Sequence, residues 1–315
     1  MVEVKNLKKY FPTAKGTVHA VDDVSFKIEK GKTMGVVGES GCGKSTLGRT
    51  IIHLLESTGG EIFIDGEDVT HCRPKELRAL REKVQIIFQD PYSSLNPRMT
   101  VKATIQEPLI LSKRFTKTQL EEETDRIMDL VGIEQRLRLA YPHELDGGRR
   151  QRVGIGRALA LKPKFIVCDE PVSALDVSIQ AQILNLLQDM QEKEGLTYMF
   201  VTHDLSVVRH ISDDICVMYL GQLVETSPSK ELFQRQLHPY TKALLSAIPS
   251  TDIHNRKQRI VLKGEVTSPI DPKPGCRFAA RCPYATEKCS QPQILEEVSP
   301  NHFVSCCRVH EINDI

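Results

Sequence analysis

Residues 38–46 read Gly-Glu-Ser-Gly-Cys-Gly-Lys-Ser-Thr, and residues of these types at this spacing can hold a polyphosphate. The run matches the phosphate-binding loop pattern G-x-x-x-x-G-K-[ST] at every position. Its glycines let the backbone wrap closely, so that N–H groups point inward at phosphate oxygens. Lys44 would then reach the β- and γ-phosphates, and the Ser45 hydroxyl would ligate Mg²⁺. The alternative is a glycine-rich turn before an ordinary helix, and the Lys-Ser pair and the flanking elements argue against it.

A second set of residues able to do chemistry stands at the end of an apolar segment. Phe165-Ile-Val-Cys-Asp169-Glu170 reads as a buried strand that ends in two carboxylates. An acidic residue at the carboxyl end of a parallel strand can bind Mg²⁺, directly or through water, and Asp169 fits that role. Glu170 would polarise an attacking water as general base. Taken alone, the pair is as readily explained as two solvated acids at a strand end.

Further polar segments stand in a fixed order around these two motifs. Each alone is a weak signal, and a single histidine at a strand end is more often structural than catalytic. The segments are Gln89 after an apolar run, Leu-Asp-Gly-Gly-Arg-Arg-Gln-Arg at 145–152, Ser-Ala-Leu-Asp at 173–176, and His203 within Thr-His-Asp.

The elements that must position these residues alternate between strand-like and helical segments. Such alternation implies an α/β core with a largely parallel sheet. The predicted strands are 18–26, 33–37, 61–64, 84–88, 165–168, 198–201 and 215–220. The predicted helices are 45–55, 119–131, 148–161, 179–194 and 229–236.

Two parts of the chain depart from this alternation. Residues from about 90 to 160 have helical segments but no convincing strand, which predicts an inserted helical subdomain. After Pro239 prolines accumulate and helical periodicity fades, so we place a domain boundary near 236–250.

Composition narrows the class of protein. The chain has 315 residues, 40% hydrophobic and 26% charged, with a formal net charge of +1. This balance argues against bulk electrostatic binding to nucleic acid or anionic lipid. No apolar run approaches ~18–20 residues, and the N-terminus lacks the apolar core of a signal peptide. We therefore expect a cytosolic chain that does not itself span a membrane.

In this order, the motifs resemble those of one family, the nucleotide-binding subunits of ATP-binding cassette (ABC) transporters. The resemblance covers nearly the whole chain. It implies an α/β fold with a P-loop NTPase (RecA-like) core, an antiparallel β subdomain and an inserted helical subdomain, over residues 1–236, and a small cysteine-rich extension over 237–315. It also implies two ATPase subunits that sandwich two ATP molecules head to tail. Each ATP then lies between one subunit's Walker A loop and the other's signature motif.

The resemblance assigns roles residue by residue. Residues 38–46 are the Walker A loop, Asp169 is the Walker B aspartate and Glu170 is the catalytic glutamate. Gln89 is the Q-loop glutamine that links the site to the membrane partner, and His203 is the switch histidine at the γ-phosphate. Residues 173–176 correspond to the D-loop.

The same resemblance implies the ligands of the nucleotide and of Mg²⁺. Phe11 matches the aromatic residue that stacks on adenine, with Tyr10 as the fallback and a buried-core role for Phe11 as the alternative. Mg²⁺ would be held by Ser45, Gln89 and Asp169. The residues implied to bind this chain's ATP are Phe11, Gly38, Glu39, Ser40, Gly41, Cys42, Gly43, Lys44, Ser45, Thr46, Gln89 and Asp169, and those implied to face the partner's ATP are Asp146, Gly147 and Gly148.

The signature motif departs from the family's pattern. It normally reads Leu-Ser-Gly-Gly-Gln, whereas residues 145–149 read Leu-Asp-Gly-Gly-Arg. The serine normally donates to the γ-phosphate of the partner's ATP, and an ionised Asp146 cannot. At ~5 Å and an effective dielectric of ~20, the bare repulsion is on the order of 3 kcal/mol. Aspartate is as good a helix N-cap as serine, and Arg149 is within reach to pair with it.

We therefore expect the two ATP sites of the pair to differ. ATP at this chain's own loop should be hydrolysed, because Glu170 and His203 are intact. ATP at the partner's loop should turn over poorly against Asp146. The alternative is that the Asp/Arg pair substitutes for Ser/Gln.

The last part of the chain gathers cysteines. Cys276, Cys282, Cys289 and Cys306, with Cys307 beside the last, resemble the C-terminal extension of oligopeptide/dipeptide permease ATPases. In that family four cysteines can hold a [4Fe-4S] cluster, whereas the spacing alone indicates only a metal site, with Zn²⁺ the alternative. Four reduced, unligated thiols are the remaining possibility.

The subtype looks like the F-type ATPase of these permeases. It implies a second, D-type ATPase subunit, two transmembrane permease subunits and an extracytoplasmic peptide-binding protein as partners, at the cytoplasmic face of the cell (inner) membrane. No nucleic acid is expected. The alternatives are an importer of nickel, glutathione or an oligosaccharide, a soluble ABC ATPase without a transport role, and a subunit that binds ATP only for regulation.

Overall fold

The computed structural model describes residues 1–248, 259–262, 264 and 267–315. The chain divides into two compact units, one formed by residues 1–71 and 200–315 and the other by residues 72–199. It leaves the first unit after His71 and returns to it within the predicted strand 198–201. We place a domain boundary near 236–250, and the last two residues of that range, 249 and 250, lie outside the described residues.

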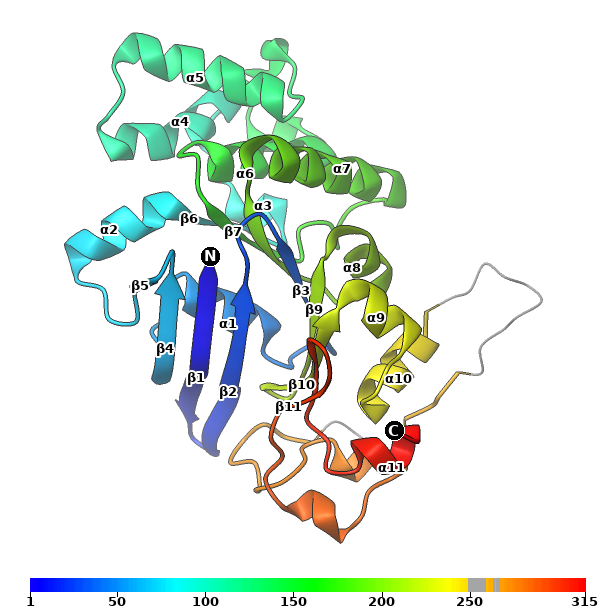
Figure 1. Ribbon diagram of the computed structural model, residues 1–315. Coiled ribbons are helices and arrows are strands. Elements are labelled where there is room, and N and C mark those ends of the chain that lie inside the picture. The colour runs from blue at the N-terminus through cyan, green and yellow to red at the C-terminus, as the bar shows by residue number, and fades with distance from the viewer. Residues whose placement is uncertain (249–258, 263, 265–266) are drawn as a thin grey trace. The chain divides into compact units, whose positions relative to one another are not determined.

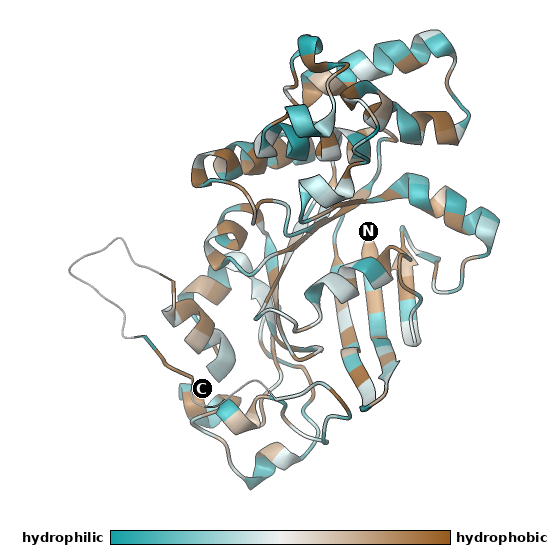
Figure 2. Ribbon diagram, turned by 180° about the vertical axis from the view of Figure 1, so that it is seen from behind, coloured by the Kyte–Doolittle hydropathy of each residue, from teal (hydrophilic) through white to brown (hydrophobic). Residues whose placement is uncertain are grey.

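The N-terminal part of the first unit is an antiparallel sheet (Figure 1). Its strand order is β2-β1-β4-β5, with β1 at Val2–Thr13, β2 at Gly16–Ile28, β4 at Gly59–Ile64 and β5 at Glu67–Asp68. Hydrophobic and hydrophilic bands alternate along these strands (Figure 2), as expected of a sheet with one buried face. This is the antiparallel β subdomain that the resemblance implied.

The strand β1 was not predicted, and its register explains why. Its pairing with β2 is irregular between Val4 and Leu7, between Leu7 and Lys9, and between Lys9 and Tyr10. Each irregularity shifts the alternation of inward and outward side chains, so the period of two on which a strand prediction relies is lost.

A second sheet of the same unit carries the phosphate-binding segment. Within this unit its strand order is β11-β12-β10-β9-β3, and β3 runs parallel to β9 while the other neighbours are antiparallel. β3 is buried along its whole length, as a parallel strand covered on both faces should be. The strands are β3 at Thr33–Val37, β9 at Asp214–Tyr219, β10 at Gln222–Pro228, β11 at Glu296–Ser299 and β12 at His302–Val304.

Helices and short 3-10 turns complete this unit. The α-helices are α1 at Lys44–Ile51, α8 at Leu205–Ile211, α9 at Ser229–Gln234, α10 at Pro239–Ser246 and α11 at Val309–Asn313. The 3-10 turns are η3 at Ala279–Arg281 and η4 at Glu287–Ser290. The expected loss of helix after Pro239 is wrong for α10. Pro239 is the first residue of that helix, where a missing N–H costs nothing and the fixed φ is already helical.

The C-terminal segment packs into the core of this unit. Phe278 is 1% exposed and meets Tyr219 of β9 and Tyr240 of α10, with ring centroids 5.3 and 5.4 Å apart. Glu225 of β10 is fully buried and accepts hydrogen bonds from the backbone N–H groups of Leu237 and His238. Its carboxylate also lies 2.7 Å from Nε2 of His302 on β12. Aromatic packing and a buried carboxylate therefore tie the extension to β9 and β10.

The second unit is mainly helical. The structure describes all of residues 90–160, and they contain helices and no strand, as predicted. β6 and β7 pair in parallel, with Val84 opposite Phe165. The elements are α2 at Pro74–Lys83, β6 at Val84–Ile87, α3 at Pro91–Ser94, α4 at Val101–Ser112, α5 at Lys117–Leu130, η1 at Gln135–Leu137, η2 at Pro142–Glu144, α6 at Gly147–Leu159, β7 at Phe165–Asp169, α7 at Val177–Glu194 and β8 at Thr197–Val201, in which the chain returns to the first unit.

Candidate nucleotide-binding and catalytic site

The glycine-rich loop joins β3 to α1, which is the strand–loop–helix context that a phosphate-binding loop needs. Gly38 has φ 153° and Gly43 has φ 105°, and side chains at these positions would collide with backbone. A Cβ on Gly38 would lie 2.1 Å from the Met218 carbonyl oxygen, and one on Gly43 would lie 1.9 Å from that of Ala20. Close packing of the loop against β9 and β2 therefore requires glycine at both places.

Lys44 is folded back over the loop. Its side chain is buried, and its ammonium group donates to the carbonyl oxygens of Gly38 at 2.8 Å and Glu39 at 3.0 Å. These hydrogen bonds hold the Lys44 ammonium group within the loop that precedes α1. A bound phosphate would meet the N-terminus of that helix. The first two residues of the predicted loop therefore hold the ammonium group of the lysine near its end.

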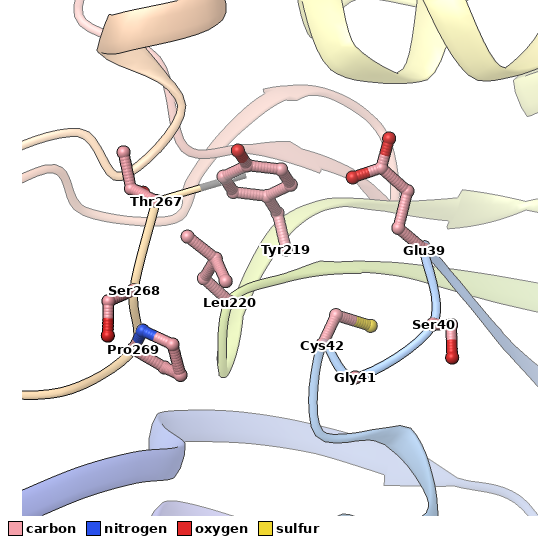
Figure 3. Close-up of a pocket in the computed structure, with 9 residues that line it drawn as sticks. All are labelled: Glu39, Ser40, Gly41, Cys42, Tyr219, Leu220, Thr267, Ser268 and Pro269. Carbon is pink, nitrogen blue, oxygen red and sulfur yellow. The ribbon is translucent and has the colours of Figure 1, made fainter. Parts of the chain in front are cut away.

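A cavity of about 240 Å³ lies beside the loop, within the first unit. Figure 3 shows the loop on one side of it and the segment Thr267–Pro269 on the other, with Tyr219 and Leu220 between them. Cys42 lines the cavity, and burial raises the pKa of its thiol. The residues around this cavity other than those of the loop carry no motif, so sequence reasoning did not find them.

The predicted adenine platform lies on β1. Phe11 is half-buried rather than part of the core, and the ammonium group of Lys9 lies 4.8 Å from the centre of its ring. Tyr10 stacks on His19 with ring centroids 4.0 Å apart, and its hydroxyl donates to the Asp22 carboxylate. Burial, followed by this hydrogen bond, raises the pKa of Tyr10 well above its usual range. Tyr10 is therefore engaged within the sheet, whereas Phe11 has no such ring partner among the described residues.

In the second unit the structure brings two predicted catalytic residues together. The amide nitrogen of Gln89 donates to a carboxylate oxygen of Glu170 at 2.9 Å. Asp169, the residue before it, ends β7 and is 1% exposed. Glu170 has φ 48°, a left-handed conformation that costs a non-glycine residue about 1 kcal/mol or more. Such strain in a carboxylate at a strand end is typical of a functional position.

The turn after Glu170 is held by its own hydrogen bonds. The backbone N–H and the hydroxyl of Ser173 both reach the Glu170 carbonyl oxygen, at 3.3 and 3.1 Å. Residues 173–176 then lead into α7, with Asp176 at its N-cap. The turn therefore fixes the direction in which the strained backbone leaves Glu170.

The altered signature motif starts α6, also in the second unit. Asp146 is the N-cap and accepts from the Arg149 backbone N–H at 2.7 Å. The Arg149 guanidinium donates to the Asp146 carboxylate and to Glu134, each at 2.9 Å. The expected pairing of Asp146 with Arg149 is present, and Glu134 shares the arginine. Gly148 packs closely against α7. A Cβ on this glycine would lie only 2.8 Å from the Ile179 side chain.

The structure places His203 in the first unit, two residues after the end of β8. The residue is exposed, and the next one, Asp204, caps α8 by accepting from the Ser206 backbone N–H. The phosphate-binding loop and His203 therefore belong to one unit, and Gln89, Asp169, Glu170 and the signature belong to the other.

The four predicted cysteines influence one another electrostatically. The pKa of Cys276 rises to about 12, chiefly through burial and further through the thiols of Cys306, Cys289 and Cys282. The pKa of Cys306 rises to about 11 for the same reasons, with Cys307 contributing. Among the described residues, however, no three His, Cys, Asp or Glu side chains are arranged to hold a metal ion. The thiols gather in one region without forming a ligand cage.

Two family models match this chain. That of the ABC transporter matches residues 21–173, and that of the oligopeptide/dipeptide transporter C-terminal region matches residues 224–289. The oligopeptide transport ATP-binding protein AppF of Bacillus subtilis (strain 168) is 49% identical over 97% of this chain and 96% of its own length. The chain belongs to the family of ABC transporter ATP-binding subunits. As an ATPase of this family, it couples hydrolysis of ATP to transport, and ATP and Mg²⁺ are its expected substrate and metal ion.

Other similar proteins agree with this membership. The dipeptide transport ATP-binding protein DppF of Haemophilus influenzae (strain ATCC 51907 / DSM 11121 / KW20 / Rd) is 47% identical over 96% of this chain and 95% of its own length. The solved dimeric structure of an ATP-binding cassette in a post-hydrolysis state with ADP and Pi is 31% identical and superimposes with a TM-score of 0.67. That match covers 73% of this chain and 99% of the cassette, and it confirms the P-loop NTPase fold. Across the described part of the chain, every helix is too short or too polar to cross a membrane.

Proposed function

We propose that this chain is the F-type ATPase subunit of an ABC importer for oligopeptides or dipeptides. The observation that carries the proposal is similarity along the whole chain. AppF, whose name assigns it to oligopeptide transport, is 49% identical over 97% of this chain, and the peptide-transporter C-terminal model matches residues 224–289. The proposed domains are an ABC domain over 1–236, with a helical subdomain at about 90–160, and an extension over 237–315; the order of the two matched regions, 21–173 and 224–289, is consistent with this division.

In this proposal the phosphate-binding loop holds the nucleotide. Residues 38–46 would direct their N–H groups at the β- and γ-phosphates, and the Lys44 ammonium group would pair with them. Phe11, half-buried on β1, would stack on adenine. The buried lysine is held by two backbone carbonyls, so it is oriented before the nucleotide arrives.

Glu170 is the proposed general base. The Gln89 amide orients its carboxylate, and the strained backbone and the Ser173 hydrogen bonds fix the turn that carries it. A carboxylate held in this way can accept a proton from the attacking water. His203 would complete the site at the γ-phosphate.

Ser45, Gln89 and Asp169 would hold Mg²⁺. Their hydroxyl, amide and carboxylate oxygens are hard ligands of the kind this cation prefers. The Gln89 nitrogen donates to Glu170, which leaves the amide oxygen for the cation. When bound, Mg²⁺ neutralises charge that develops between the β- and γ-phosphates.

The second half of each ATP site would come from another subunit. The proposed partners are a D-type ATPase in a heterodimer, two transmembrane permease subunits and an extracytoplasmic peptide-binding protein, with this chain at the cytoplasmic face of the membrane. The helical unit offers exposed apolar side chains to such partners, and Tyr92, Ile110, Leu111 and Leu139 are each more than half exposed. Apolar side chains in that state are suited to a protein interface.

The cysteine-rich extension is proposed to bind a [4Fe-4S] cluster or Zn²⁺ through Cys276, Cys282, Cys289 and Cys306. The peptide-transporter C-terminal model covers Cys276, Cys282 and Cys289, and a metal bound there would have to displace the thiol protons. The optical spectrum and the iron and zinc content of purified protein test this. Brown protein with about four irons supports the cluster, colourless protein with zinc supports the alternative, and metal-free protein contradicts both.

The function itself is tested on the assembled complex. Membrane subunits should co-purify from detergent extracts, and ATP hydrolysis should rise when peptide-loaded binding protein is added. Glu170→Gln in the same complex should abolish that rise. Co-purification of ribosomes or nucleic acid in place of membrane subunits, or stimulation by nickel, glutathione or an oligosaccharide and not by peptides, would contradict peptide import.

A further inference from the structure

An arginine from the C-terminal extension reaches the phosphate-binding loop. The Arg281 guanidinium donates two hydrogen bonds to the Glu39 carboxylate, at 2.7 and 3.1 Å. The two residues are 242 positions apart in the sequence, and both belong to the first unit. The arginine side chain is only 9% exposed and the glutamate 28%, so solvent screens this pair weakly. A bidentate contact of this kind fixes the relative orientation of the two side chains as well as pairing their charges.

The extension holds Arg281 in place through its neighbours. Phe278, in the turn that precedes it, is buried between Tyr219 and Tyr240. Arg277 donates to the Leu220 carbonyl oxygen and to the Asp22 carboxylate of β2. The segment is therefore anchored on three elements before it reaches the loop.

The same region also holds the backbone of the loop. The Tyr240 hydroxyl accepts a hydrogen bond from the Glu39 backbone N–H at 2.9 Å. Burial raises the pKa of Tyr219, and the neighbouring Arg281 opposes that rise. Glu39 is thus bound at its backbone N–H by Tyr240 and at its carboxylate by Arg281, while its carbonyl oxygen accepts from Lys44.

Glu39 poses an electrostatic problem at this position. Its carboxylate is part of a loop whose expected ligand carries several negative charges, and its own backbone carbonyl oxygen accepts a hydrogen bond from Lys44. An uncompensated unit charge at ~8 Å and an effective dielectric of ~20–40 weakens polyphosphate binding by roughly five- to thirtyfold. Arg281 removes that repulsion by pairing with the carboxylate.

We propose that Arg281 is a positioning residue for ATP, which neutralises Glu39 and holds it against the extension so that the loop accepts a polyphosphate. The inference rests on the proposed role of residues 38–46. It assigns part of the nucleotide affinity of this ATPase to its cysteine-rich extension, in which Arg281 directly precedes Cys282 and Arg277 directly follows Cys276.

The test is binding of a fluorescent ATP analogue to the full chain with Mg²⁺, together with KM and kcat for ATP hydrolysis by the assembled complex. Arg281→Ala should raise the dissociation constant and KM about fivefold or more, with kcat within about twofold of the unchanged chain. Arg281→Lys should recover part of the lost ATP affinity, because lysine keeps the positive charge but cannot make the bidentate contact. Arg281→Ala combined with Glu39→Gln should recover most of it, because no charge then remains to be neutralised.

Arg308→Ala is the matched control. Arg308 lies in the same extension and pairs with Glu311, which is half exposed, and with the Tyr284 carbonyl oxygen. It should leave ATP affinity unchanged. Affinity of Arg281→Ala within twofold of the unchanged chain would overturn the proposal. So would failure of Glu39→Gln to restore it, since that result would mean that the arginine matters only for folding. If the unchanged chain and Arg308→Ala do not bind the analogue, the proposed nucleotide site itself is wrong.

Discussion

The hydrogen bond between Gln89 and Glu170 gives a direct test of the catalytic assignment. Gln89→Ala removes the donor that orients the carboxylate, so kcat for ATP hydrolysis should fall roughly tenfold, with a smaller rise in KM. The loop that holds the phosphates is untouched by this change. Steady-state ATP hydrolysis by the assembled complex measures both constants.

Gln85→Ala is the matched control for that substitution. Gln85 lies on β6, four residues before Gln89, and its amide donates to the Arg81 carbonyl oxygen and to no proposed catalytic group. Both constants should stay within about twofold. Equal losses in the two variants would mean that Gln89 acts on the stability of β6 and not on Glu170.

Residue types at fixed spacing predicted the strand before residues 38–46, the helix after them and the strand that leads to Asp169, because each motif is local. The sequence could not predict Arg281, Tyr219 or Tyr240 beside the loop. Their contacts with Glu39 and with each other depend on tertiary packing across more than two hundred residues in the case of Arg281. The same limit holds for Glu134, which shares Arg149 with Asp146 and has no motif of its own.

At the scale of elements, strands buried on both faces were the most predictable. β3 was predicted with its observed bounds, and β7 ends one residue later than predicted, because a continuous apolar run marks such strands. α4 was missed, and Pro108 within it is a residue that ordinarily ends a helix. β1 was missed because its bulges break the alternation on which the prediction depends.

The start of α10 predicts how stability depends on pH. Burial lowers the pKa of His238 to about 4, and its Nδ1 accepts a hydrogen bond from the Tyr240 backbone N–H. The unfolded chain takes up a proton at this residue below pH ~6.5, whereas the folded chain stays neutral until pH ~4. Acid therefore favours unfolding across this window, by on the order of 3 kcal/mol for this group.

His238→Asn should remove that contribution while keeping an acceptor at the helix cap. Its free energy of unfolding, measured with denaturant, should fall less than that of the unchanged chain between pH 6.5 and pH 4. Above pH 7 the two should differ by a constant amount. Parallel curves throughout the range would show that the histidine is not held neutral in the folded state.

At the scale of the whole molecule, the sequence predicted the family and the class of fold, and the comparisons confirm both. In the proposed assembly, the second half of each ATP site comes from another subunit. The signature motif would then act on the nucleotide of that subunit, so the consequence of its altered residues would appear only in the assembly. The structure shows that Arg149 divides its guanidinium between Asp146 and Glu134.

That division bears on the proposed inequality of the two sites. Arg149 pairs with two carboxylates, so these three side chains together carry a net negative charge. Arg136 offsets that charge through its own ion pair with Glu134. Asp146 is also more than half exposed at its side chain, so it can meet the partner's phosphate. Its charge is thus weakened but not removed, and no hydroxyl donor takes the place of the serine.

Asp146→Ser with Arg149→Gln should therefore raise ATP turnover by the assembled complex, by up to about twofold if one site is now nearly silent and becomes equal to the other. The measurement is ATP hydrolysis and peptide uptake in reconstituted vesicles. Glu134→Gln is the control, because it releases Arg149 to Asp146 alone and supplies no donor, so it should change turnover less. If hydrolysis and uptake in the double variant equal those of the unchanged complex, the Asp/Arg pair replaces Ser/Gln in function and the two sites are equivalent.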